Sequence, residues 1–140
     1  LSLKQRINEA KTLHFDIKKD KLPSILLCDL NDREFSITID ALTNKRFYKN
    51  ELKKDDFILF DSYDIAPKKV YNPHPEFKGF KRTPTSYFVG HGNTLDFIFV
   101  SKDLENSVKN HKVFDEHLQK NKNGTLKQSD HAQVVCELEI

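Results

Sequence analysis

The first 28 residues combine an amphipathic helix with a short apolar strand, and this pair constrains the fold more than any other segment. Apolar residues recur at spacings of three and four, which predicts a helix with one apolar face. They are Leu3, Ile7, Ala10, Leu13 and Ile17. Ser2 is a candidate cap, and Pro23 ends any helical continuation. The apolar run 24–28 then predicts a fully buried strand, and a helix leading into a buried strand predicts an α/β layered architecture.

The carboxyl-terminal third is rich in predicted strands. Residues 85–89 and 95–100 contain Tyr, Phe, Ile and Val, and the residues between them, 90–93, supply two glycines and an asparagine. This pattern predicts a β-hairpin. Further strands are predicted over 108–114 and 132–140, where the end of the chain alternates between apolar and acidic residues.

The middle of the chain gives weaker signals. Phe35, Ile39 and Leu42 continue a helical rhythm, and a second short helix is predicted around Leu52, Ile58 and Leu59. Residues 64–84 contain four prolines and a Lys-rich stretch, which predicts a long surface loop. Asn121 to Gly124 predicts a turn.

Composition excludes several classes of protein. The chain has 140 residues, which fits one domain, and no apolar run long enough to span a membrane. With 23 basic and 21 acidic residues its formal net charge is +2, so charge gives no strong argument for nucleic acid or acidic lipid. Local basic clusters such as 78–82 are expected to form a solvated surface. Cys28 and Cys136 lie in apolar runs and are expected to be core residues.

Three short polar clusters lie at or inside predicted strands. They contain Asp29 with Asn31, then Asp96, then Asp130 with His131. Asp96 interrupts an otherwise apolar strand, and an ionised carboxylate there is costly without a partner, so we expect a histidine or a metal beside it. Simpler interpretations remain open for each cluster: a turn cap, a solvent-facing edge residue and an ordinary strand start.

These clusters and one further strand resemble the motifs of a known family. Residues 27–31 (LCDLN) resemble a "GDxN" strand end, and residues 94–101 (TLDFIFVS) resemble an "R-I/L-D-Y/F-I-F/L-V-S" strand. Residues 129–135 (SDHAQVV) resemble an "SDHxPV" terminus, and residues 84–88 (PTSYF) resemble the "T-Y/F" strand that precedes the second motif. Over essentially all 140 residues the sequence is similar to the endonuclease/exonuclease/phosphatase superfamily, also called DNase I-like.

The resemblance implies an α/β (α+β) fold, namely half of a two-sheet αβ sandwich with a mixed or antiparallel sheet and flanking helices. Residues 1–140 would then be the carboxyl-terminal portion of a single domain. The amino-terminal half of such a domain supplies a second sheet, an Asn and the Glu that is the chief magnesium ligand. We therefore expect the parent protein to be a hydrolase and the isolated chain to be inactive.

The resemblance also implies a role for each polar residue. His131 would transfer a proton or contact the scissile phosphate, and Asp96 would orient and polarise it. Asp29 would position or activate the attacking water, or protonate the leaving group. Asn31 would hydrogen-bond a phosphoryl oxygen, and Asp130 would assist the metal. The expected cation is Mg²⁺, with Mn²⁺ as a substitute, because hard cations prefer oxygen ligands.

The sequence departs from the family motifs at three places. Cys28 stands where the family has Gly, Thr94 replaces an Arg, and Ala132 with Gln133 replaces the segment that contains Pro. None of these changes removes a proposed catalytic group. His91 and His117 are extra polar groups near the motifs and are expected to be surface histidines.

The substrate class stays open at this stage. A phosphate ester in a nucleic acid, a nucleotide or a phospholipid head group would each suit the expected chemistry, through nuclease, phosphomonoesterase or phosphodiesterase activity. The alternative is a non-catalytic binding or interaction module on the same fold. Strands 25–28 and 134–136 would each lack cover on one face without a partner sheet, so self-association of the chain is also expected.

Overall fold

The computed structural model describes residues 2–44, 58–69, 82–88, 91–120 and 129–140. Helices and strands are mixed along the chain, and no helix in these ranges is long and apolar enough to cross a membrane. In order, the elements are α1 (Leu3–Asp20), β1 (Ile25–Asp29), α2 (Ile37–Thr43), β2 (Leu59–Asp61), α4 (Ser62–Ile65), β3 (Lys68–Lys69), β4 (Ser86–Phe88), β5 (His91–Asn93), β6 (Asp96–Ser101), a 3-10 helix η1 (Lys102–Ser107), β7 (Val108–Phe114), α5 (Glu116–Lys120) and β8 (Gln133–Leu138).

Helix α1 begins and ends at residues suited to these positions. Ser2 and Gln5 form a capping box: the Gln5 N–H donates to Ser2 Oγ at 3.3 Å, and the Ser2 N–H donates to Gln5 Oε1 at 2.8 Å. Lys21 ends the helix in the left-handed conformation, with φ of 54°. This confirms the predicted helix and its Ser2 cap.

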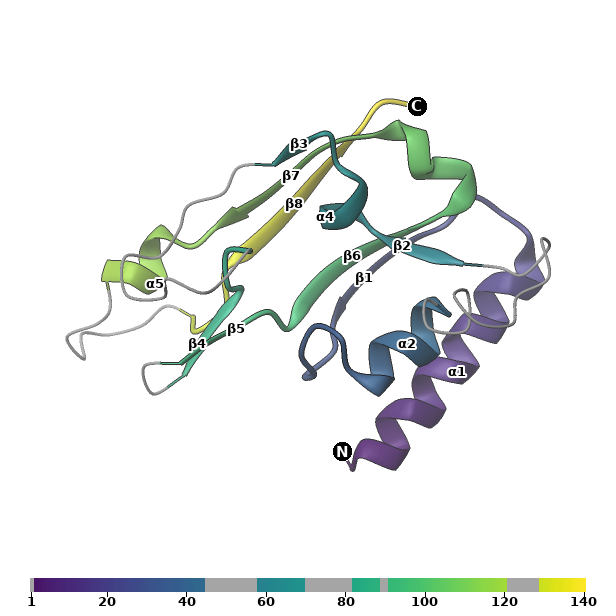
Figure 1. The fold of residues 1–140 in the computed structure, drawn as a ribbon, viewed down its shortest axis with the longest axis horizontal. Coiled ribbons are helices and arrows are strands. Elements are labelled where there is room, and N and C mark those ends of the chain that lie inside the picture. The colour runs from purple at the N-terminus through teal and green to yellow at the C-terminus, as the bar shows by residue number, and fades with distance from the viewer. Residues whose placement is uncertain (1, 45–57, 70–81, 89–90, 121–128) are drawn as a thin grey trace.

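Strands β1, β6 and β2 form an antiparallel sheet with β6 in the centre. Helices α1 and α2 pack on one face of this sheet (Figure 1), and the core between them includes Ala10, Leu42, Phe97 and Phe99. Side chains alternate across a strand, so the residues between these core positions point to the opposite face. The register places Asp29 directly opposite Asp96.

A second sheet contains β7, with the parallel strand β3 on one side and the antiparallel strand β8 on the other. Strands β4 and β5 form a separate ribbon, and an isolated bridge from Ser86 to His131 joins it to the segment before β8. The strands predicted over 108–114 and at the end of the chain are confirmed. Near the site, three segments distant in sequence therefore meet: the end of β1, the start of β6 and the start of β8 (Figure 1).

Strand β1 is present as predicted but is not buried on both faces. Ile25 is 44% exposed and Leu27 is 69% exposed, because only the opposite face of the strand lies under α1 and α2. Val135 of β8 is 45% exposed and occupies one of the exposed positions in the alternating pattern of that strand. The expectation of uncovered apolar side chains on both strands is thus confirmed.

The predictions for the middle of the chain need correction. Leu59 lies in strand β2 rather than in a helix, while Leu52 lies outside the described residues. The predicted loop over 64–84 includes the end of α4 and strand β3 in its described part. The predicted turn at 121–124 lies outside the described residues.

The predicted β-hairpin between residues 85–89 and 95–100 is wrong, because these two strands do not pair with each other. Strand β4 pairs with β5, which was expected to be the turn, and β6 pairs instead with β1 and β2. Local periodicity identified the strand at 95–100 but not its neighbours, because pairing between β1 and β6 joins residues about 70 positions apart.

Candidate active site

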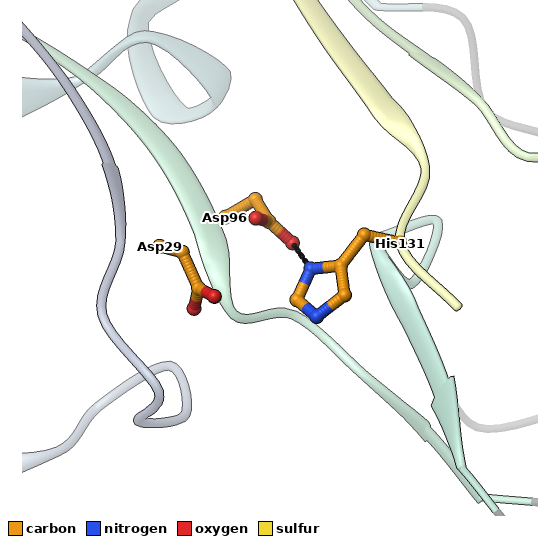
Figure 2. A group of neighbouring side chains, drawn as sticks. All are labelled: Asp29, Asp96 and His131. Carbon is orange, nitrogen blue, oxygen red and sulfur yellow. Dashed lines mark hydrogen bonds and ion pairs between the residues drawn. The ribbon is translucent and has the colours of Figure 1, made fainter. Parts of the chain in front are cut away.

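Three of the predicted site residues converge. Asp29, Asp96 and His131 each offer one ligand atom, and these atoms all lie within 4.8 Å of one another. Figure 2 shows the two carboxylates and the imidazole pointing toward a common space from β1, β6 and the segment before β8. It is the one group of three or more potential metal ligands found among the described residues.

Asp96 and His131 form a hydrogen-bonded pair. His131 Nδ1 lies 2.8 Å from Asp96 Oδ2 (Figure 2). The His131 side chain is 31% exposed and that of Asp96 is 20% exposed. The expectation that Asp96 needs a partner is therefore confirmed, and the partner is a histidine. A carboxylate at one imidazole nitrogen orients the ring and leaves the other nitrogen, Nε2, for proton transfer.

The charges around His131 favour its protonated form. Partial burial by itself lowers the pKa of His131, but the hydrogen bond to Asp96 and the negative charges of Asp96, Asp29 and Asp130 outweigh this effect. The net pKa of His131 is therefore raised above its ordinary value.

A tight turn holds Asp29 and Asn31 next to each other. The Asn31 N–H donates to Asp29 Oδ1 at 2.9 Å, and Asn31 has the left-handed φ of 47° that asparagine tolerates. The Leu30 N–H donates to the Leu95 carbonyl at 2.9 Å, so this turn is fixed to the start of β6. Both Asp29 and Asn31 are exposed.

Asp130 and the two extra histidines lie outside the three-residue cluster. The Asp130 carbonyl accepts the Tyr87 N–H at 3.0 Å, and its side chain is exposed, so its metal-binding role stays a prediction. His91 is exposed, as expected. His117 is not a free surface histidine: it is half-buried, and its Nε2 lies 2.9 Å from the His131 carbonyl.

Two residues near the site were not found by sequence reasoning. Thr85 is fully buried and its Oγ1 lies 2.7 Å from Asp96 Oδ2, although the resemblance had marked only its strand. Arg82 was expected on a solvated basic surface, but it is 2% exposed and paired with Asp61 at 2.6 Å. The only sequence signal for a buried Arg82 would have been its acidic partners Asp61 and Glu34, and these lie far from it along the chain.

Both cysteines are free, and instead of being fully buried core residues they are half-buried and pack against the edges of core clusters. Cys28, which replaces the glycine of the motif, packs against the core below α1 and α2. Burial and the neighbouring negative charges of Asp29, Asp61 and Asp96 raise its pKa to about 12. A raised thiol pKa disfavours the reactive thiolate at neutral pH, and the side chain packs against the core.

A hollow of ≈ 270 Å³ lies beside the site, between α1, α2 and the end of β1. Asp29 and Asn31 reach its wall, whereas Asp96 and His131 do not line it. Asp29 is therefore the residue that the hollow and the three-residue cluster have in common.

Comparisons with known proteins agree with the fold. No protein-family model matches the chain, and no curated protein sequence matches it. Two solved structures from Bacteroides thetaiotaomicron do match. A mannosyl-6-phosphatase is 23% identical with a TM-score of 0.61, and an endonuclease/exonuclease/phosphatase family protein is 25% identical with a TM-score of 0.63.

This chain has the endonuclease/exonuclease/phosphatase fold. The first match covers 100% of this chain and 48% of the solved chain, and the second covers 99% and 46%. The chain therefore spans about half the length of the structures that it resembles. The expected mixed α/β class with antiparallel pairing, matching half of such a domain, is confirmed.

Proposed function

We propose that this chain is the carboxyl-terminal portion of a metal-dependent phosphoesterase, with Asp29, Asn31, Asp96 and His131 as its catalytic residues. The observation that supports this most directly is the 2.8 Å pair between His131 Nδ1 and Asp96 Oδ2, with Asp29 in the same cluster. A histidine oriented by a carboxylate is a suitable proton-transfer group.

The charge balance of the site supports a cation. The negative charges of Asp29, Asp96 and Asp130 all act on a single imidazole, and a phosphate ester brings further negative charge. Carboxylate oxygens suit a hard divalent cation, so Asp29 and Asp130 are the proposed contacts for Mg²⁺, or for Mn²⁺ in its place. When bound, such an ion would neutralise phosphate charge and polarise the phosphoryl group.

The residues of this chain divide the remaining tasks. Because Asp96 occupies Nδ1, His131 has Nε2 for the reacting groups, where it accepts a proton when neutral and donates one when charged. Asp29 positions the attacking water or the leaving group. Asn31, fixed beside Asp29, offers its amide to a phosphoryl oxygen whose charge grows during the reaction.

The first test is hydrolysis by the natural full-length protein. Suitable substrates are p-nitrophenyl phosphate for monoesters, bis(p-nitrophenyl) phosphate for diesters, and mannose 6-phosphate, because one structural match is a mannosyl-6-phosphatase. We expect Mg²⁺-dependent turnover that EDTA abolishes. His131→Ala is expected to lower kcat by about 10²–10⁴-fold, the usual contribution of general acid–base catalysis.

His14→Ala is the matched control, because His14 is also half-buried and its Nδ1 lies 2.6 Å from a carbonyl, that of Leu42. It should leave turnover unchanged. Wild-type protein without turnover, or equal turnover in the His131 variant, would contradict the proposal and favour a non-catalytic binding module.

A further inference from the structure

Thr85 joins the segments that form the site. Its side chain is fully buried just before β4. Its N–H donates to the Asn93 carbonyl at 3.0 Å, and its carbonyl accepts the Ala132 N–H at 2.7 Å. The backbone of Thr85 thus fixes the end of β5 and the residue that follows His131.

The hydroxyl of Thr85 contacts the start of β6 in three ways. Oγ1 accepts the N–H of Leu95 at 3.0 Å and the N–H of Asp96 at 3.1 Å, and it lies 2.7 Å from Asp96 Oδ2. A hydroxyl has two acceptor positions and one hydrogen. The two N–H groups use the acceptor positions, so the hydroxyl hydrogen is left for Asp96 Oδ2.

This arrangement orients the Asp96 carboxylate toward His131. Oδ2 accepts the hydroxyl hydrogen of Thr85 and lies 2.8 Å from His131 Nδ1, and an ionised carboxylate oxygen can only accept there. Nδ1 must then bear the hydrogen. The neutral imidazole is thereby held in the tautomer whose Nε2 is an acceptor directed away from Asp96.

We propose that Thr85 is a positioning residue for the hydrolytic site, which acts by orienting the Asp96 carboxylate so that Oδ2 faces His131 Nδ1 and favours the Nδ1–H tautomer. The proposal rests on the proposed phosphoesterase function. Thr85 contacts neither the reacting groups nor the metal in this scheme, and it acts only through Asp96.

The test compares three substitutions in the natural full-length protein. Thr85→Val keeps the shape but removes the hydroxyl, Thr85→Ser keeps the hydroxyl, and Thr43→Val is the control. Thr43 is also buried, but its hydroxyl donates to the Ile39 carbonyl within its own helix at 2.7 Å. We expect Thr85→Val to lower kcat by about 10–100-fold, the range for losing a hydrogen bond to a charged group, with KM nearly unchanged. Thr85→Ser and Thr43→Val should retain kcat to within about threefold.

A second readout does not depend on turnover. Two-bond ¹H–¹⁵N NMR spectra of the imidazole, recorded where His131 is neutral, report which ring nitrogen bears the hydrogen. The wild type and Thr85→Ser should show the Nδ1–H form, and Thr85→Val should show a mixture with the Nε2–H form. If Thr85→Val does not fold, Thr85→Ala replaces it, because the smaller side chain admits water to the two N–H groups.

The outcomes separate the two proposals. Unchanged kcat together with an unchanged tautomer in Thr85→Val would overturn the role of Thr85 while leaving the phosphoesterase intact. A loss of kcat that Thr85→Ser fails to restore would also overturn it, since packing would then explain the effect. A wild type without turnover would overturn the proposed function, and the tautomer comparison would still decide whether Thr85 controls His131.

Discussion

Arg82 has the most unusual environment of the residues around the site. Its guanidinium lies 2.6 Å from Asp61 and 3.3 Å from Glu34, and 4.4 Å from the centre of the Tyr63 ring. Burial raises the pKa of both carboxyls, although the charge of Arg82 opposes this shift. A cation buried with two acids fixes the segment that leads to Thr85, and removal of one partner leaves buried charge uncompensated.

We predict that Arg82→Met lowers the free energy of unfolding by about 3–5 kcal/mol at pH 7. Without the cation, the folded-state pKa values of Asp61 and Glu34 lie still further above their unfolded values. The folded variant then binds protons more readily than the unfolded chain. Its loss of stability relative to the wild type should therefore shrink as the pH falls through the raised folded-state pKa values of the two carboxyls.

Urea denaturation of the wild type and the variant at pH 7 and pH 5 measures both effects. The double variant Arg82→Met with Asp61→Asn should recover part of the loss, because it removes one uncompensated charge. A deficit below about 1 kcal/mol, or one that grows on acidification, would contradict this account of Arg82.

At the scale of elements, strand register decides whether the site exists. Cys28 and Phe97 face the helices, so Asp29 and Asp96 face the other side of the sheet and lie opposite each other. A slip of one residue would turn every side chain of a strand to the wrong face. The apolar face below α1 and α2 therefore also holds the two acids in place.

Strand β5 packs closely against Pro84, the residue that precedes Thr85. A Cβ atom added at Gly92 would lie 2.9 Å from Pro84 Cγ, closer than side-chain atoms approach each other. We predict that Gly92→Ala lowers the free energy of unfolding by about 1–3 kcal/mol, the cost of overpacking. Thermal denaturation beside His91→Ala, an exposed site on the same strand, checks this, and equal stability of the two variants would contradict it.

Sequence patterns predicted elements better than their partners. The periodicity of α1 and the β-branched and aromatic residues of β6 and β7 are local signals, and these elements lie where they were expected. The pairing of β6 with β1, and of β4 with β5, depends on contacts that no local window contains.

The site shows the same division. The motifs identified Asp29, Asp96 and His131, which converge as expected. Thr85 and Arg82 were missed because their importance depends on burial, and neither residue type is unusual in a surface loop. Only the three-dimensional arrangement shows that one contacts Asp96 and the other is enclosed by acids.

At the scale of the whole molecule, the chain matches about half of each solved structure and has apolar side chains without cover. Ile25 and Leu27 of β1 and Val135 of β8 are the main examples on the strands. Exposed apolar surface of this kind favours association.

We predict that the 140-residue chain by itself associates in a concentration-dependent way. Sedimentation velocity should show species larger than the monomer, and the double substitution Leu27→Lys with Val135→Lys should shift the chain toward monomer. Phe15→Lys is the control, because Phe15 is 63% exposed but lies on α1. A stable, cooperative monomer of the unmodified chain would contradict the prediction.

The most direct test of the central claim is a double-mutant cycle on phosphate-ester hydrolysis. The cycle measures kcat for the wild-type full-length protein, Asp96→Asn, His131→Ala and the double variant. Because Asp96 acts through His131, we predict that the double variant is no slower than His131→Ala alone. Losses that multiply in the double variant would show that the two residues act independently and would contradict the account.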